Sequence, residues 1–135
     1  MSDGHVLART ALTALCVKLG EAEVARGLAV SVTEVLTWAD DISGIPAQAL
    51  LRLEELTYFH TALSDLGYPD TDIRRWFTEA TLASGAPLDL VARGTYSDAE
   101  VLRTAIARAK KRAAPHRVTG RPLPQLPGLA TDSPA

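Results

Sequence analysis

Residues 20–38 carry the strongest structural signal in this sequence and read GEAEVARGLAVSVTEVLTW. Glu21 to Gly27 has the composition of a short helix, and Ser31-Val32-Thr33-Glu34 forms a capping box that starts a second helix running to about Ala39. A short helix, a tight three-residue turn and a capped helix are typical of a helix-turn-helix. An ordinary corner between two helices of an all-α domain explains the same spacing equally well.

The second of these helices is poorly equipped to bind DNA. Its inward positions form a small core with the preceding helix, for which we expect Val24, Ala25, Val30, Val35 and Trp38. Its outward residues include Thr33, Glu34 and Thr37, with no lysine or arginine among them. Affinity for DNA depends strongly on neutralising phosphates, and bases are most often contacted by Arg, Lys, Asn or Gln. Thr33 and Thr37 are the candidate DNA contacts that remain on this helix.

Helical periodicity extends in both directions from this stretch. Upstream, residues 6–19 place apolar side chains at helical spacing, and Gly20 ends that helix. Downstream, Pro46 is well placed as the first residue of a long helix that runs to about Leu66 and stops at Gly67.

The second half of the chain continues the helical pattern. Asp70 is expected to cap a helix with its apolar face at Ile73, Trp76, Phe77 and Ala80, followed by a short helix over residues 87–93 that Gly94 ends. A second capping box, Ser97-Asp98-Ala99-Glu100, predicts the start of a last helix running to about Arg112. No segment alternates as a convincing strand, so the predicted fold class is all-α.

The chain changes character after Arg112. Residues 115–135 hold five of the eight prolines, few large apolar groups and no periodicity, so we predict a disordered or extended tail. The predicted organisation is a helix-turn-helix region over 1–45, a linking helix with a small helical domain over 46–112, and a Pro-rich tail over 113–135.

Composition excludes several classes of protein. Of the 135 residues, 47% are hydrophobic and 22% charged, as in globular domains. No apolar run approaches the ~18 residues of a membrane helix, and the N-terminus lacks the basic start of a signal peptide. Cys16, the single cysteine, cannot form an internal disulfide or a zinc knuckle. We therefore expect a cytoplasmic protein without a membrane segment.

The net charge of −2 is unevenly distributed along the chain. Residues 1–50 carry three basic and six acidic side chains, residues 51–100 carry four and nine, and residues 101–135 carry seven and one. An acidic body with a basic end suits a protein that binds a partner and whose end can contact something anionic.

No residue pattern predicts a catalytic, metal or cofactor site. The three histidines are far apart in sequence, and His60 lies on the apolar row of the long helix, so we predict a hydrogen-bonded core or interface histidine. Asp70-Thr71-Asp72 lacks the later glycine and glutamate of a calcium loop. Glu54 and Glu55 are adjacent in a helix and point in different directions.

Residues 73–102, IRRWFTEATLASGAPLDLVARGTYSDAEVL, carry a more specific signal. A helix bearing Arg-x-Trp-Phe, a loop, a short Pro-Leu-Asp-Leu-Val helix, a glycine and a capped apolar helix follow one another. This order resembles the toxin-binding C-terminal domain of the Xre/MbcA/ParS family of antitoxins. In that family the domain follows an Xre-like helix-turn-helix, and residues 55–63 resemble the linking helix of MbcA-type members. The resemblance covers roughly residues 12–110.

The resemblance implies an antitoxin of a type II toxin-antitoxin system. Such antitoxins neutralise RES-domain toxins, which consume NAD, by covering the active site, and often repress their own operon. They need no cofactor of their own. A homodimer or a larger assembly with the toxin is expected. The residues that would bind the toxin are Trp76, Phe77, Pro87, Leu90, Arg93, Gly94 and Tyr96.

Two departures from the family pattern keep other functions open. The acidic second helix argues against operator binding, and the Pro-rich tail extends beyond the usual end of the family. One alternative is a stand-alone helix-turn-helix transcriptional regulator whose phosphate contacts come from Arg108, Lys110, Lys111, Arg112, Arg117 and Arg121. Within that set, Lys110, Lys111 and Arg112 are the candidate DNA contacts outside the helix-turn-helix. A general helical adaptor is a further alternative.

Overall fold

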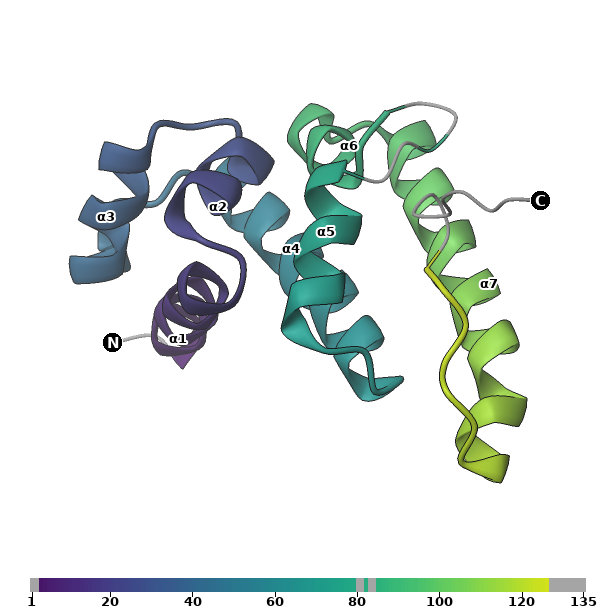
Figure 1. Cartoon of the computed structure of the whole chain (residues 1–135). Helices are drawn as coiled ribbons and strands as arrows, with labels where there is room; N and C mark the ends of the chain where they lie inside the picture. Colours follow the sequence, from purple (N-terminus) through teal and green to yellow (C-terminus); the bar gives the residue numbers. More distant parts are fainter. Residues whose placement is uncertain (1–2, 80–81, 83–84, 127–135) are drawn as a thin grey trace.

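The computed structural model describes residues 3–79, 82 and 85–126 and is built from helices (Figure 1). No strand occurs among these residues, which confirms the all-α prediction; Leu82 and Gly85 form one isolated bridge. The elements are α1 (Asp3–Lys18), α2 (Glu21–Leu28), α3 (Val32–Asp40), η1 (Ile42–Gly44), α4 (Ala47–Asp65), α5 (Asp70–Glu79), α6 (Pro87–Arg93) and α7 (Tyr96–Thr119).

The first capping box is present as predicted. The Oγ of Ser31 accepts a hydrogen bond from the backbone N–H of Glu34 at 3.1 Å, and the Glu34 carboxylate accepts one from the Ser31 N–H at 3.0 Å. The connection between α2 and α3 spans residues 29–31, with Ala29 in the left-handed conformation (φ 62°).

The second predicted capping box is wrong by two residues. Thr95, not Ser97, caps α7, and its Oγ1 accepts a hydrogen bond from the N–H of Asp98 at 3.1 Å. Asp98 supplies the acid of this cap region, but its carboxylate is held by Arg93 at 2.9 Å. Thr95 and Asp98 repeat, two residues earlier, the spacing of Ser97 and Glu100, and the helix starts at this earlier pattern.

Two other helix starts are shifted by one residue. Pro46 was predicted as the first residue of the long helix, but it is the N-cap in extended conformation, and α4 begins at Ala47. Asp70 was predicted as a cap but is the first residue of α5, and the carbonyl of Pro69 accepts a hydrogen bond from Ile73 N–H at 3.1 Å. Ala80, predicted on the inner face of that helix, lies outside the described residues.

The prediction of a disordered or extended tail from residue 113 is wrong for residues 113–119, which are helical. α7 continues to Thr119 and includes Pro115, and Ala113 in this part of the helix is completely buried in the core. Gly120, at φ 76°, ends the helix. Residues 121–126 then run back along the molecule without helix, and residues 127–135 lie outside the described part of the chain.

Residues 121–126 are anchored near the α4–α5 turn. The hydroxyl of Tyr68 donates a 2.7 Å hydrogen bond to the carbonyl of Pro124, and Leu126 is only 2% exposed. This stretch of a proline-rich segment is therefore packed, although it has no helical periodicity.

A single hydrophobic core joins the two regions predicted as 1–45 and 46–112. α2 packs against α1, α3, α4 and α6. Gly27 makes the closest of these approaches possible, since a Cβ on it would lie 2.9 Å from a methyl of Leu56 and 2.9 Å from a methyl of Leu88. The helix-turn-helix candidate and the segment that resembles the antitoxin domain are thus parts of one packed body.

Among the described residues, no helix is long and apolar enough to cross a membrane.

Candidate partner-binding surface

The seven residues predicted to bind a toxin fall into two groups. Trp76 and Phe77 are fully buried and pack edge to face, with their ring centroids 5.0 Å apart. Pro87 and Leu90 are also buried. These four side chains hold the fold together and cannot touch a partner without rearrangement. The other three, Arg93, Gly94 and Tyr96, are exposed where α6 meets α7.

The junction at residues 93–96, called the corner below, is built by local hydrogen bonds. Gly94 adopts φ 67°, a left-handed conformation that glycine accepts without steric cost, and its N–H donates to Leu90 O at 3.2 Å. Arg93 donates to both carboxylate oxygens of Asp98, at 2.9 and 3.1 Å. These bonds, with that from Thr95, lower the pKa of Asp98. The corner is therefore rigid and presents Tyr96, which is 79% exposed.

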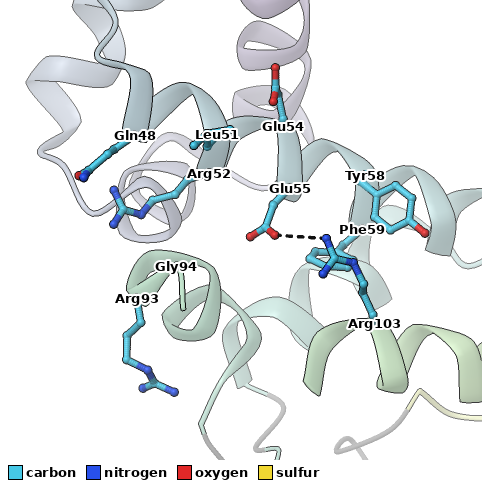
Figure 2. Close-up of a pocket in the computed structure, with 10 residues that line it drawn as sticks. All are labelled: Gln48, Leu51, Arg52, Glu54, Glu55, Tyr58, Phe59, Arg93, Gly94 and Arg103. Atoms are coloured by element: carbon cyan, nitrogen blue, oxygen red, sulfur yellow. Dashed lines mark ion pairs between the residues drawn. The ribbon is translucent and has the colours of Figure 1, made fainter. Parts of the chain in front are cut away.

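A pocket of about 580 Å³, the corner pocket, lies between α4 and the corner (Figure 2). It combines three arginines with apolar and acidic side chains. Its lining residues are Gln48, Leu51, Arg52, Glu54, Glu55, Tyr58, Phe59, Arg93, Gly94 and Arg103.

The arginines of this pocket differ in how they are paired. Arg103 lies 3.8 Å from Glu55 and 3.9 Å from Glu100, which are long ion pairs. Arg52 forms no ion pair with any described residue, and its Nε is buried without a hydrogen-bond partner. This guanidinium lies next to Gly94, since a Cβ there would make an ordinary van der Waals contact of 3.5 Å with Arg52 Nη2.

A second groove, of about 730 Å³, runs between α1 and α4 and is mostly apolar. Leu7, 70% exposed, lies on the α1 side, while Glu54 and Tyr58 of α4 line both this groove and the corner pocket. The outer face of α4 thus carries a continuous surface of apolar and charged groups.

The candidate DNA contacts do not form one site. Thr33 and Thr37 are exposed on α3, and the Thr37 hydroxyl donates to Thr33 O at 2.9 Å, while residues 110–112 are exposed on α7. Figure 1 shows α3 and α7 at opposite ends of the molecule. α3 also exposes Leu36 by 46% of its surface, an apolar group beside the threonines.

His60 is a core histidine, as predicted, but the predicted hydrogen bond is not found at Nε2. The residue is 3% exposed, and its Nε2 lies 3.5 Å from an Asp70 carboxylate oxygen, without a hydrogen-bond partner. Burial and the nearby charge of Lys18 lower its pKa, and Asp70 opposes this shift.

Across the described residues, no group of three or more His, Cys, Asp or Glu side chains is arranged to hold a metal ion.

Sequence reasoning missed the part of this surface that α4 supplies. Leu51 and Tyr58 are 62% and 53% exposed, although both are large apolar residues in a helix with a well-filled inner face. Their positions outside the Leu53, Leu56 and Leu63 row of α4 are a signal that the sequence contains. The proximity of Arg52 to Gly94 depends on packing between distant helices and leaves no local signature.

No protein-family model matches the chain, and no curated protein or solved structure is significantly similar to it.

Proposed function

We propose that this protein is an antitoxin that neutralises a RES-type, NAD-consuming toxin by covering the entrance to its active site. The observation that carries the proposal is the corner itself. The Pro-Leu-Asp-Leu-Val helix, a left-handed Gly94 and a capped α7 hold Arg93 and Tyr96 at the surface in a fixed arrangement.

Steric occlusion needs a rigid surface rather than a reactive group. Tyrosine and arginine are enriched among the residues that contribute most to protein interfaces. Tyrosine buries a large, rigid area at low conformational-entropy cost. Tyr96 supplies such an exposed aromatic, and the hydrogen bonds from Arg93 to Asp98 preorganise its surroundings. Preorganisation lowers the free-energy cost of binding.

The proposal is tested by co-expressing the full chain with the protein encoded by the neighbouring open reading frame. The two should co-purify, and addition of the chain should suppress NAD consumption by the partner. Tyr96→Ala should weaken suppression by roughly tenfold, the size expected for an interface aromatic. Val118→Ala, at an 86% exposed position near the far end of α7, is the matched control and should have no effect.

A stand-alone DNA-binding regulator is the second candidate, favoured by the exposed basic residues of α7. Lys110, Lys111 and Arg112 are all exposed on this helix. A chain that binds its own promoter DNA, but neither retains the neighbouring gene product nor alters NAD consumption, supports this candidate and rules out the antitoxin.

A further inference from the structure

We infer that the corner pocket is the docking site for an acidic side chain of the partner protein, with Arg52 as its receptor, Leu51 as the apolar contact beside it and Tyr58 as an apolar contact at the other end of the pocket. The inference rests on the proposed function, because the partner is the protein that the antitoxin would neutralise. It adds α4 to a binding surface whose residues, as predicted from the sequence, all lie between Trp76 and Tyr96.

The first step is the electrostatic state of Arg52. An arginine carries its charge at all physiological pH values and has five N–H donors. The Nε of Arg52 is buried without an acceptor, and none of the described residues forms an ion pair with its guanidinium. A buried donor without an acceptor costs about 1–3 kcal/mol in general, so such groups in native proteins call for an explanation.

The second step is that the other two arginines of the pocket already face carboxylates. Arg93 is held by Asp98, and Arg103 faces Glu55 (Figure 2). The same view shows Arg52 and Glu55 extending from α4 toward the corner, whereas Glu54 points away from it. Arg52 is therefore the charge in this pocket that an incoming carboxylate complements.

The third step is the chemistry around the guanidinium. Leu51 and Tyr58 lie on the exposed side of α4, 62% and 53% exposed, and both line the pocket with Arg52. Figure 2 shows Leu51 near Arg52, and Tyr58 at the other end of the pocket, near Arg103. Arginine and aromatic side chains are both enriched in protein interfaces. Apolar neighbours that exclude water strengthen an arginine–carboxylate pair, which favours an acidic residue flanked by apolar residues over a free anion.

The test measures affinity for the co-purified partner by calorimetry with charge variants at the rim. Leu51→Asp should weaken binding by roughly 10- to 100-fold, because it removes an apolar contact and places a like charge beside the incoming carboxylate, and Leu51→Lys, which removes the same contact without the repulsion, should weaken binding clearly less. Leu51 is largely exposed, so both variants are expected to keep the wild-type melting temperature. Arg52→Gln should reduce the affinity for the partner by a similar factor. Arg52→Lys should retain only part of the wild-type affinity, because an ammonium cannot form a bidentate pair.

Arg108→Gln, exposed on α7 and outside the corner pocket, is the charge-matched control and should bind as wild type does. A photo-crosslinker in place of Leu51 should label a segment of the partner that contains Asp or Glu, and reversing that residue to Arg should restore binding to Arg52→Glu. Equal losses for Leu51→Asp and Leu51→Lys, or full affinity in folded Arg52→Gln, would overturn the inference and leave the proposed function standing. Absence of partner binding by the wild-type chain refutes both.

Discussion

Arg26 of α2 and Asp89 of α6, which are 63 residues apart in sequence, share two hydrogen bonds of 2.9 Å each. The planar guanidinium meets both carboxylate oxygens, the geometry in which arginine pairs are strongest. A second ion pair, Arg74 to Glu23 at 3.2 Å, joins α5 to the same helix. An ion pair thus links the helix-turn-helix candidate to α6, the helix that precedes the corner.

A double-mutant cycle with Arg26→Gln and Asp89→Asn should give a coupling energy of about 0.5–1 kcal/mol at neutral pH, because both side chains are 41–46% exposed and water screens the pair. Urea unfolding of the four proteins measures it. The bond from Arg26 lowers the pKa of Asp89, so the stabilisation is present above the ordinary pKa of about 4 and is lost as pH falls through the lower folded value. A coupling energy that persists after Asp89 is protonated would show that the coupling does not come from the ion pair between Arg26 and Asp89.

Gly27→Ala should destabilise the protein by about 1–3 kcal/mol, although alanine is the better helix former. The new methyl would lie 2.9 Å from terminal methyls of both Leu56 and Leu88, which are completely buried, so both side chains must shift within the packed core. Chemical denaturation checks the change. Gly44→Ala is the matched control, since nothing lies within 4 Å of its Cβ position, and its stability should stay within ~0.5 kcal/mol of wild type.

Trp76→Ala should cost about 3–5 kcal/mol, because it empties the space of the largest fully buried side chain. Trp76→Phe should cost less, since it also removes an indole N–H that is buried without a partner in the described structure. Any loss of partner binding by Trp76→Ala is therefore expected to follow unfolding, which circular dichroism detects. A variant that melts like wild type but no longer binds would mean that the indole contacts the partner directly.

Features set by a few neighbouring residues could be predicted from the sequence, and features set by distant contacts could not. The cap at Ser31 depends on Glu34 three residues away, and it was predicted correctly. Two overlapping local patterns, at Thr95 and at Ser97, offered a start for α7, and its end lies beyond Ala113, which contacts with distant residues bury in the core, so both were placed wrongly. The pairing state of Arg52 follows from how α4 meets the corner, and no local pattern encodes it.

His60 should make stability depend on pH below about 7. Its folded pKa is lowered by burial and by Lys18, so the unfolded chain binds the proton more readily. The stability contributed by the neutral imidazole is complete above the ordinary pKa of about 6.5 and declines as pH falls toward the folded value. His60→Gln should flatten the dependence of the urea midpoint on pH in this range. A wild-type midpoint that rises on acidification through pH 6 would show that the imidazole is stabilised in its charged form.

DNA binding, where it occurs, should depend on α7 rather than on α3. Residues 110–112 are Lys-Lys-Arg and exposed, whereas α3 contains no cation and lies at the opposite end of the molecule (Figure 1). These charges do not serve the negative end of the helix dipole, which acts within the last turn, because α7 continues seven residues beyond Arg112 to Thr119. Each phosphate contact contributes about 0.9 to the log–log slope of affinity against salt, so replacing all three by alanine should flatten the slope by up to about 3.

Fluorescence anisotropy with promoter DNA at several salt concentrations measures this slope. Thr33→Ala and Thr37→Ala provide the control, because neither side chain carries a charge, and both should leave the slope unchanged while altering any preference for sequence. The triple alanine variant should keep its melting temperature, since all three residues are exposed. An unchanged slope together with intact DNA binding would exclude the basic stretch of α7 as the phosphate-binding surface, and the contacts would then have to come from another cationic part of the chain.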